Sequence, residues 1–381
     1  MEQTVRRGAS TQQDVSKAVG ELYEAIGQED AQLTVLFVSP SYDREQLQRE
    51  ILAKFGSKGV IGCTTAGEFG PAGYRDESLS GFSIGGGDFV VESVGVVGLS
   101  DFDYPRAQQV VSKMQSRLRD RGLSCDSSNT FAYLLIDGLS VREENVVSAL
   151  YSAMGEIPLF GGSAGDALGF AQTQVLFGGS FHADAAVFAI IRTERPFTVF
   201  KTQHFVHSDK KLVVTEAEPS KRVVMEINGD PAAVAYAQAV DVPIGDLSPK
   251  IFAKHPLVLS LGDTNYVRSI QQVNEDQSLS FYCAIDEGIV LTVAKGHDLV
   301  ENLRGAFEAT CEQVGEPELV IGCDCVLRNL EISEEKLKGE VGEIFERYRV
   351  VGFSTYGEQF NAMHVNQTFT GVALGKRRET S

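Results

Sequence analysis

Apolar and polar positions alternate along this chain in a way that predicts one strand-helix-strand unit three times. In the first copy, an apolar run at 33–38 precedes helical spacing over 43–55, and a second apolar run follows at 60–61. The same order returns over 131–160 and over 318–351. A repeated order of this kind predicts a fold built from three similar units.

Each unit ends in a short glycine-rich segment that we call an elbow. The elbows read GCTTAGE at 62–68, GGSAGD at 161–166 and GFSTYGE at 352–358. All three combine small or hydroxylated residues with a penultimate glycine and a terminal acid, a composition typical of a tight bend. Extended segments follow the elbows at 79–84, at 173–177 with 185–192, and at 367–374.

The expected fold is α/β, of the α+β type with mixed sheets. Short connections inside each unit favour parallel pairing of its two strands, and the extended segments favour antiparallel additions. Helices should cover one face of each sheet. Residues 197–293 are rich in strand and turn signals, and exposed chain near 210–220 marks a boundary. We expect an N-terminal helix within 1–30 and two packed domains, 31–215 and 216–378.

Composition narrows the classes of function. Of the 381 residues, 34 are Lys or Arg and 52 are Asp or Glu, so the formal net charge is −18. This charge repels phosphate backbones and anionic lipids, so neither nucleic acid nor a membrane is an expected partner. The sequence shows no secretory signal and no apolar run of membrane-spanning length, which favours a cytoplasmic protein. The six cysteines then stay reduced, and no structural disulfide is expected.

A ligand pocket at the elbows is the first functional hypothesis, because glycines expose backbone amides and hydroxyl groups add donors. The candidate residues lie in or beside the repeated units and are Cys63, Thr64, Glu68, Asp137, Ser163, Asp166, Tyr356, Glu358 and Asn366. In the alternative interpretation, each glycine allows a tight bend and each acid caps a neighbouring amide.

Catalysis is less favoured by the sequence. Cys63 and Ser163 stand at strand-to-turn positions like those of nucleophiles in hydrolases. However, no histidine occurs before His182, and neither residue has the spacing of a nucleophile motif. We expect no enzymatic activity, and the alternative is a thiol-dependent enzyme that uses Cys63 or Cys323.

Metal or haem ligation is the remaining chemistry. Cys323 and Cys325 are separated by one residue, and with Cys283 they can ligate zinc or an iron–sulfur cluster, although a closed site needs about four ligands. They can equally be small buried side chains. His204 stands near two phenylalanines and can ligate haem iron. His364 enters the last strand, where it either ties down buried backbone or faces a ligand.

At four ordered motifs the chain resembles the FIST family of intracellular sensory proteins. The motifs are VIGCTTAGEFGPAGY at 60–74, LIDGLS at 135–140, LFGGSAGD at 159–166 and VGFSTYGEQFNAMHVNQT at 351–368. The resemblance implies a FIST N-like domain at 31–215 and a FIST C-like domain at 216–378. Further stretches resemble the NosP branch of this family, namely 203–205, 266–270, 280–283 and 322–328.

NosP proteins are haem-binding nitric oxide sensors that regulate a partner protein. The resemblance therefore implies haem as cofactor and nitric oxide as ligand. It implies a separate histidine kinase, diguanylate cyclase or phosphodiesterase as partner, in the two-component and cyclic-di-GMP signalling that controls biofilms. His204 is the first candidate for the iron ligand, then His364, then a thiolate from Cys323 or Cys325. The alternative within the family is a sensor of an amino acid or other small metabolite at the elbows. The sequence leaves homo-oligomerisation open.

Overall fold

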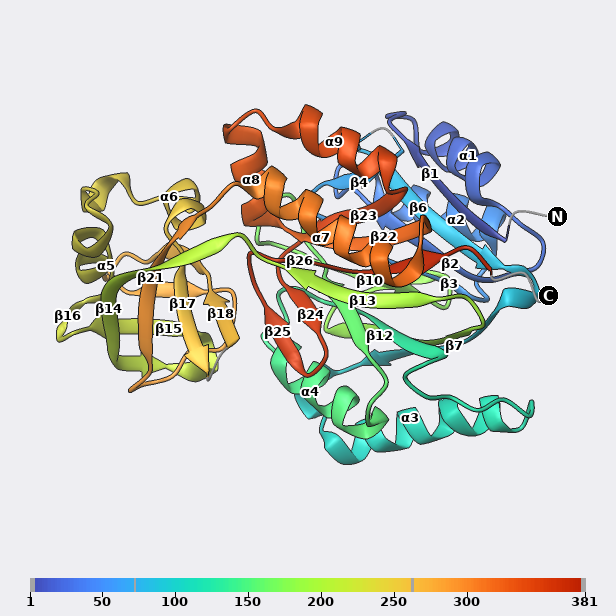
Figure 1. Cartoon of the computed structure of the whole chain (residues 1–381), viewed down its shortest axis with the longest axis horizontal. Coiled ribbons are helices and arrows are strands. Elements are labelled where there is room, and N and C mark those ends of the chain that lie inside the picture. Colours follow the sequence, from blue (N-terminus) through green and yellow to red (C-terminus); the bar gives the residue numbers. More distant parts are fainter. Residues whose placement is uncertain (1–3, 72, 262–263, 378–381) are drawn as a thin grey trace.

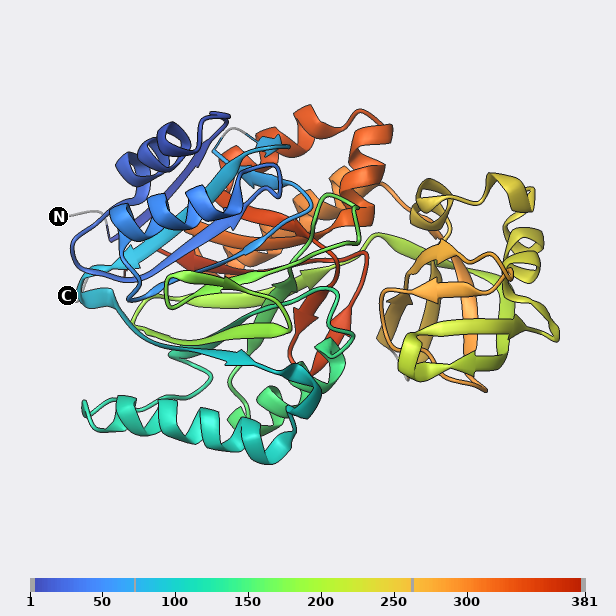
Figure 2. The ribbon, with the colours of Figure 1, turned by 180° about the vertical axis from the view of Figure 1, so that it is seen from behind.

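The computed structural model describes residues 4–71, 73–261 and 264–377, and it contains two bodies of unequal size (Figure 1). The large body is built from three similar units. The small body, residues 205–296, is inserted into the third unit. Seen from behind, the small body again stands beside one end of the large body (Figure 2).

The three units share one order of elements: edge strand, helix, strand, helix, strand, elbow, hairpin and final strand. The first unit contains β1 (Val5–Ser10), α1 (Val15–Ile26), β2 (Ala31–Val38), α2 (Arg44–Phe55), β3 (Val60–Thr64), the hairpin β4 (Glu68–Gly70) and β5 (Gly73–Arg75), and β6 (Leu79–Gly85). The second contains β7 (Phe89–Val97), α3 (Tyr104–Arg119), β8 (Thr130–Ile136), α4 (Glu143–Met154), β9 (Leu159–Ser163), β10 (Val175–Phe177), β11 (Ser180–His182) and β12 (Ala185–Thr193).

The third unit follows the same order, with the small body between its edge strand and its first helix. It contains β13 (Phe197–Thr202), α7 (Leu299–Val314), β22 (Pro317–Cys325), α8 (Val326–Glu334), α9 (Lys338–Arg347), β23 (Val350–Thr355), β24 (Glu358–Phe360), β25 (Met363–Val365) and β26 (Phe369–Gly375). The sequence predicted an N-terminal helix within 1–30, and in the structure this segment contains the strand β1 as well as the helix α1. The boundary expected at 215/216 lies within the long strand that opens the small body, β14 (Phe205–Glu218).

The mixed α/β fold expected from the sequence is confirmed. In each unit the two strands that flank the second helix pair in parallel, and the final strand adds antiparallel to the first of them. The resulting sheets are sheet 1 (β1-β6-β2-β3-β10-β11), sheet 2 (β25-β24-β9-β8-β12-β7) and sheet 3 (β13-β26-β22-β23-β4-β5).

The hairpins that follow the elbows are exchanged between the units. The hairpin β4–β5 of the first unit extends sheet 3, β10–β11 of the second unit extends sheet 1, and β24–β25 of the third unit extends sheet 2. Each sheet is therefore completed by another unit. This exchange brings the three elbows together at one end of the large body.

Side-chain alternation along the strands divides the large body into a central core and outer layers. On β2, Leu33, Val35 and Phe37 point into the core that all three sheets share, while Leu36 and Val38 pack under α1 and α2. The helices α3 and α4 cover sheet 2, and α7 and α9 cover sheet 3. Every sheet thus buries both faces, which explains the long apolar runs in the sequence.

Helix α1 shows how local sequence defines the outer layer. Its buried residues Val15, Ala18, Leu22 and Ile26 recur at helical spacing, and Asp14 caps its start by accepting the Lys17 N–H at 2.9 Å. No helix in the described ranges combines the length and the apolar character needed to cross a membrane.

The small body is a curved antiparallel sheet with two short helices. Its strands pair in the order β18-β17-β21-β14-β15-β20-β19, with β16 beside β15. Besides β14 its elements are β15 (Val223–Ile227), β16 (Asp230–Pro231), α5 (Ala232–Val240), α6 (Pro249–Lys254), β17 (Leu257–Leu261), β18 (Thr264–Arg268), β19 (Ile270–Val273), β20 (Leu279–Phe281) and β21 (Val290–Gly296). It has its own apolar core and packs against the large body through a buried ion pair of Arg222 with Glu143.

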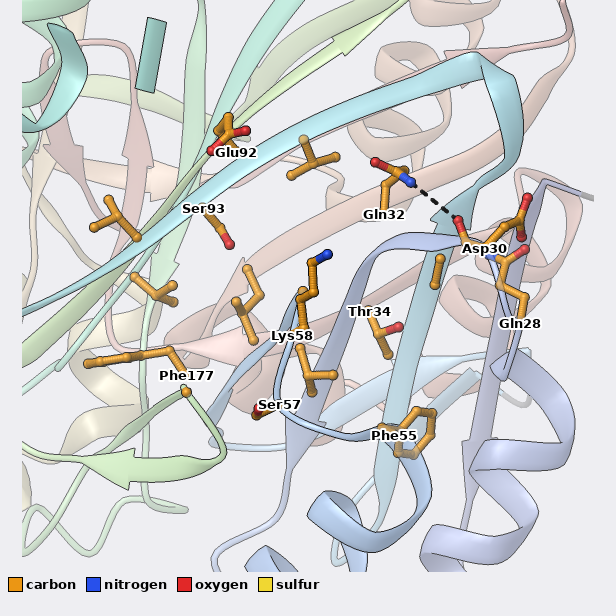
Figure 3. A pocket seen from close by; sticks show the side chains of 18 of the residues that line it. Gln28, Asp30, Gln32, Thr34, Phe55, Ser57, Lys58, Glu92, Ser93 and Phe177 are labelled. Carbon is orange, nitrogen blue, oxygen red and sulfur yellow. Dashed lines mark hydrogen bonds between the residues drawn. The ribbon is translucent and has the colours of Figure 1, made fainter. Parts of the chain in front are cut away.

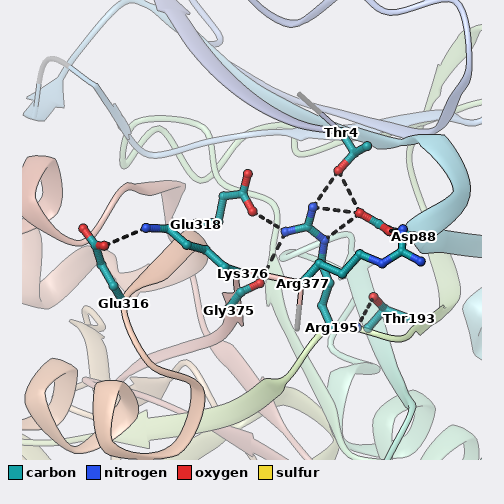
Figure 4. Close-up of polar contacts among 9 residues, drawn as sticks. All are labelled: Thr4, Asp88, Thr193, Arg195, Glu316, Glu318, Gly375, Lys376 and Arg377. Carbon is teal, nitrogen blue, oxygen red and sulfur yellow. Dashed lines mark hydrogen bonds and ion pairs between the residues drawn. The ribbon is translucent and has the colours of Figure 1, made fainter. Parts of the chain in front are cut away.

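The end of the large body opposite the elbows is held together by Arg195 (Figure 4). Its guanidinium donates to Asp88 Oδ2 at 2.8 Å and to Thr4 Oγ1 at 2.7 Å, and it forms an ion pair with Glu318. It also reaches the Gly375 carbonyl at 3.3 Å. One nearly buried side chain therefore joins segments that begin or end all three units.

Candidate functional site

The three elbows are joined directly by backbone hydrogen bonds. Ser354 N–H donates to the Gly67 carbonyl at 2.7 Å, and Ala66 N–H donates to the Ser354 carbonyl at 2.9 Å. The second elbow joins the other two through Gly165 N–H on Thr64 O (3.0 Å) and Ser163 N–H on Gly357 O (2.9 Å). The parallel strand pairs all end here, and α/β proteins commonly bind ligands at the carboxyl ends of such strands.

Two of the elbow acids hold the start of a following strand. Glu68 accepts the N–H and the hydroxyl of Ser78 at 3.1 and 2.6 Å, and Glu358 accepts the same two groups of Thr368 at 3.0 and 2.7 Å. Both acids are fully buried. Burial raises the pKa of Glu68 to about 8 and the pKa of Glu358 well above its usual range. These acids therefore cap neighbouring amides from inside the protein.

The third elbow acid, Asp166, organises the loop that follows it. Its carboxylate accepts the N–H groups of Phe170, Ala171 and Gln172 at 2.8, 2.7 and 2.9 Å, and it also accepts the hydroxyl of Tyr356. The loop at 167–172 is thereby fixed against the third elbow.

Asp137, Thr64 and Ser163 have similar structural contacts. Asp137 accepts Asp184 N–H at 2.6 Å, Thr64 Oγ1 accepts Gln174 N–H at 3.1 Å, and Ser163 Oγ accepts from Gln359 Nε2 at 2.9 Å. The structure thus brings many of the predicted pocket residues together around the elbows, with their polar atoms largely occupied by one another.

A pocket of about 570 Å³ opens beside this centre, and we call it the elbow pocket. It is lined by the turn after β2 (39–41), the first elbow, the turn before β6 (76–77), the chain after the second elbow (167–168) and one face of α8. Its volume lies in the range of pockets that bind small molecules.

Polar side chains converge over Gly67 on the wall of the elbow pocket. Gly67 has φ +126°, which strongly favours glycine, and a Cβ there would lie 3.1 Å from Asn329 Nδ2, 3.4 Å from Asp76 Oδ1 and 3.6 Å from Ser354 Oγ. Asn329 is only 7% exposed. Its Oδ1 atom and the Ser354 hydroxyl find no hydrogen-bond partner among the described protein residues. Buried polar atoms of this kind need a partner, and a bound ligand can supply it.

The rim of the elbow pocket carries both signs of charge. Lys338 Nζ lies 3.2 Å from Asp76 Oδ2, and both side chains are partly exposed to solvent. An ion pair at a pocket rim is weak in water, so either group can exchange its partner for a charged ligand. Leu168, Leu330 and Val326 supply apolar surface beside these polar groups.

Helix α8 connects the elbow pocket to the two chain crossings between the bodies. Asn329 faces the pocket, and Arg328 beside it donates to Asp324 Oδ1 at 2.6 Å and to His204 Nδ1 at 2.8 Å. Glu331 on the next turn lies 3.0 Å from His204 Nε2. The His204 carbonyl in turn accepts the N–H of His297 at 2.6 Å. The same helix therefore lines the pocket and contacts His204, whose carbonyl joins the two crossings.

Comparison with known protein families agrees with this architecture. A FIST N domain matches residues 32–230, and a FIST C domain matches residues 232–361. The chain belongs to the FIST family. FIST domains are sensor domains of signal transduction. The uncharacterized protein MJ1623 of Methanocaldococcus jannaschii is 24% identical to the FIST chain over 388 residues, which cover 89% of this chain and 72% of that protein.

The surroundings of His204 in this FIST chain do not fit a haem ligand. Its Nδ1 accepts from Arg328, so Nε2 carries the proton and donates to Glu331. Neither nitrogen therefore has a free lone pair for iron. Desolvation lowers the pKa of His204, and the fully buried guanidinium beside it adds to this effect.

His364 and Asn366 lie over the third elbow of the FIST chain. A Cβ at Gly357 would lie 2.2 Å from the His364 ring and 3.0 Å from Asn366 Nδ2, so only glycine fits under them. His364 Nδ1 lies 3.2 Å from Gln359 Nε2, and desolvation lowers the pKa of His364. Its Nε2 and both polar atoms of Asn366 lack a partner among the described residues. These two residues form a second set of incompletely bonded groups near the small body.

The four candidate cysteines of the FIST chain lie in three different parts of the structure. Cys63 and Cys323 lie in the central core, Cys325 lies in a small cluster with Tyr356, and Cys283 follows β20 in the small body. Burial raises the pKa of all four thiols. Within the described ranges, no group of three or more His, Cys, Asp or Glu residues is placed to hold a metal ion. This arrangement does not fit a zinc or iron–sulfur site.

Sequence reasoning missed Asp76, Asn329 and Lys338, which line the elbow pocket, and Ser354, which is buried behind Gly67. They come from the first and third units, which are far apart in the sequence and are brought together by contacts such as the exchanged hairpin β4–β5. One signal was available, because Asn329 directly follows the stretch 322–328 at the carboxyl end of the third unit's first strand. That position is a ligand-binding position in many α/β folds.

Proposed function

We propose that this FIST chain is a sensor that binds a small zwitterionic metabolite of the amino-acid class in the elbow pocket. The observation that supports this function is the group of polar atoms over Gly67. Asn329 Oδ1 and Ser354 Oγ are unpartnered, and Asp76 faces the same point in a pocket of small-molecule size.

The chemistry of the pocket favours an amino acid over other small ligands. A ligand carboxylate can pair with Lys338, and its ammonium group can pair with Asp76. Asn329 can complete the hydrogen bonds of either group, since its amide is both donor and acceptor. Leu168 and Leu330 offer apolar contact to a side chain. A purely anionic ligand would meet the unfavourable charge of Asp76.

Helix α8 offers a route from the bound ligand to an output. A ligand that contacts Asn329 favours one position of α8, and the same helix holds His204 through Arg328 and Glu331. His204 lies in the crossing between the two bodies, so ligand binding shifts the population of small-body positions. The FIST chain would pass this change to a separate histidine kinase or cyclic-di-GMP enzyme in the cytoplasm.

Haem-based sensing of nitric oxide is the finer function that the NosP resemblance implies. For His204 to ligate iron, it would have to give up its bonds to Arg328 and Glu331, leaving a buried guanidinium without its ring partner. His364 is fully enclosed beneath the small body. For these reasons we place the ligand in the elbow pocket and assign no haem ligand.

A thermal-shift panel of the twenty amino acids tests the proposed function. We expect at least one amino acid to raise the unfolding temperature of the wild-type protein. Lys338→Ala should abolish the rise, because it removes the pairing group for the carboxylate. Lys376→Ala is the matched control, since Lys376 forms a similar exposed ion pair, with Glu316 at 2.8 Å, at a distant site. A panel without any stabilising amino acid, or equal shifts in both variants, would contradict the proposal.

A further inference from the structure

The three sheets of the large body meet along three seams, and each seam contains an edge strand. Strand β1 lies against sheet 3, β13 lies against sheet 2, and β7 lies against sheet 1. Pairing registers identify equivalent positions in these strands. Arg7 is opposite Phe82, Val199 is opposite Val372, and Ser93 is opposite Ala189, at matching places in the three units.

Two of the seams are closed by side chains of the edge strand. In the first, Arg7 crosses the seam and its Nη1 donates to the Val350 carbonyl at 2.8 Å. In the second, Phe197 packs on Phe131 with ring centroids 5.0 Å apart, and Val199 packs against the central core beside it. Side chains of both edge strands thus reach the neighbouring sheet, and the pocket that remains beside Arg7 is smaller, about 380 Å³.

The third seam is open. Its equivalent position carries the small Ser93, and a groove of about 1290 Å³ runs along β7. The opposite wall is formed by the chain before β2 (27–32) and by the end of α2 with the turn after it (54–59). Figure 3 shows Ser93 and Glu92 on one side of this groove and Lys58 extending toward them from the other. We call it the β7 groove.

The backbone of β7 is available along this groove. Strand β7 pairs with β12 on one edge only and ends sheet 2 on the other. The outward N–H and C=O groups of residues 90–96 form no hydrogen bond with other described residues. A free strand edge is a template for another extended chain, and folded proteins generally protect such edges. Here the free edge of β7 is recessed in a groove, which protects it from pairing with the broad surface of another protein.

We propose that the β7 groove binds an extended peptide segment of a partner protein, which adds to β7 as a further strand. An extended peptide is narrow enough to reach a recessed strand edge. In strand addition, the hydrogen bonds between the peptide backbone and the edge strand supply the affinity. Val91 and Phe177 offer apolar contact to alternate peptide side chains.

The charge of the groove adds a requirement for the peptide. Glu92 is already paired with Arg117 at 3.3 Å and with Arg121 at 3.0 Å. Lys54 and Lys58 on the facing wall form no ion pair with another residue of the described chain. Glu29, Asp30 and Asp120 also line the groove, so a peptide carboxylate is favoured opposite Lys58 and disfavoured beside these acids. This surface is independent of the elbow pocket, which lies at the other end of the strands.

Selection from a phage library of random 12-residue linear peptides against the full chain tests this proposal. We expect selected peptides to protect the amides of residues 90–96 from hydrogen exchange. Ser93→Arg places an arginine at the position that Arg7 occupies in the first seam. Its side chain should fill part of the β7 groove and weaken peptide binding at least tenfold. Ser112→Arg on the exposed face of α3 is the matched control and should leave binding unchanged.

Lys58→Glu provides a second variant, because this exposed side chain is not needed for folding. It should weaken binding of the same peptides severalfold. The proposal is overturned if selection yields no binder, if protection falls outside 90–96, or if Ser93→Arg and Lys58→Glu bind the peptides as wild type does. A wild-type dimer that Ser93→Arg converts to a monomer would also overturn it and would assign the edge to a second copy.

Discussion

At the scale of single residues, the elbow pocket depends on a glycine that cannot be replaced without cost. Gly67 combines a backbone conformation that other residues rarely adopt with close contacts to Asn329 and Asp76. The acid that ends the same elbow, Glu68, is buried and has a pKa of about 8. Both features are local, and each leads to a separate prediction.

Replacing Gly67 by alanine should impair both folding and binding. The strained backbone should lower the free energy of unfolding by about 1 to 3 kcal/mol. The added methyl group, 3.1 Å from Asn329 Nδ2, should also abolish stabilisation by amino acids. Chemical denaturation measures the first effect and thermal shift the second. Gly20→Ala in α1 is the control, because nothing lies within 4 Å of its Cβ position, and it should stabilise the protein slightly.

Burial of Glu68 should make stability fall as pH rises. Its ordinary pKa of 4.5 is raised to about 8, so between these values the folded state binds more protons than the unfolded state. The stabilisation is complete below about pH 4.5 and is lost as pH approaches 8. The free energy of unfolding, measured by urea denaturation, should fall with pH less steeply in Glu68→Gln than in wild type, by about 1 kcal/mol per pH unit. An unchanged slope would show that Glu68 titrates normally in the folded protein.

At the scale of elements, the sequence predicted the repeated units well and their interactions poorly. The runs at 33–38 and 131–136 became β2 and β8 because apolar side chains are needed on both faces of a covered strand. Pairing of β4–β5 with the third unit was not predictable, since periodicity carries no information about which sheet a short hairpin joins. The sequence also ranked His204 first as an iron ligand, and it could not indicate the contacts of this ring with Arg328 and Glu331, which lie more than 120 residues away.

Helix α8 should transmit ligand binding to the crossings between the bodies through Glu331. Glu331→Ala removes the acceptor of the His204 ring proton, so the amides at 203–206 should exchange faster without ligand. The change in their exchange on addition of an amino acid should become smaller, while the dissociation constant changes less than about threefold. Hydrogen-exchange mass spectrometry measures both. Glu340→Ala on the exposed face of α9 should behave as wild type, and identical behaviour of the two variants would exclude this route.

At the scale of the whole molecule, exchanged hairpins and Arg195 make the large body one cooperative structure. Each sheet contains a hairpin from another unit, so no unit can complete its sheet alone. Arg195 joins Asp88, Thr4 and Glu318 at the opposite end from the elbows (Figure 4). The small body takes no part in this exchange, but it is joined to the large body by more than the crossings beside His204, because Arg222 forms a buried ion pair with Glu143 of α4.

Removing Arg195 should therefore be strongly destabilising. Arg195→Leu leaves the buried Asp88 with only the exposed Arg377 as ion-pair partner and removes the partner of Glu318, so the free energy of unfolding should fall by about 3 kcal/mol. Arg192→Leu is the control, because Arg192 pairs with the exposed Glu194, and the expected loss is below about 1 kcal/mol. Chemical denaturation followed by circular dichroism compares them. Similar losses in both variants would show that the Arg195 contacts do not hold the units together.

The central claim is that a zwitterionic metabolite binds at Asn329 in the elbow pocket, and calorimetric titration of Asn329→Leu tests it most directly. The titrant is the amino acid that best stabilises the wild-type protein. Leucine preserves the volume of Asn329 and removes an unsatisfied polar group, so the unliganded variant should be as stable as wild type. We predict 1:1 binding to wild type and affinity at least tenfold weaker in the variant. Equal affinity of the two proteins would contradict the account.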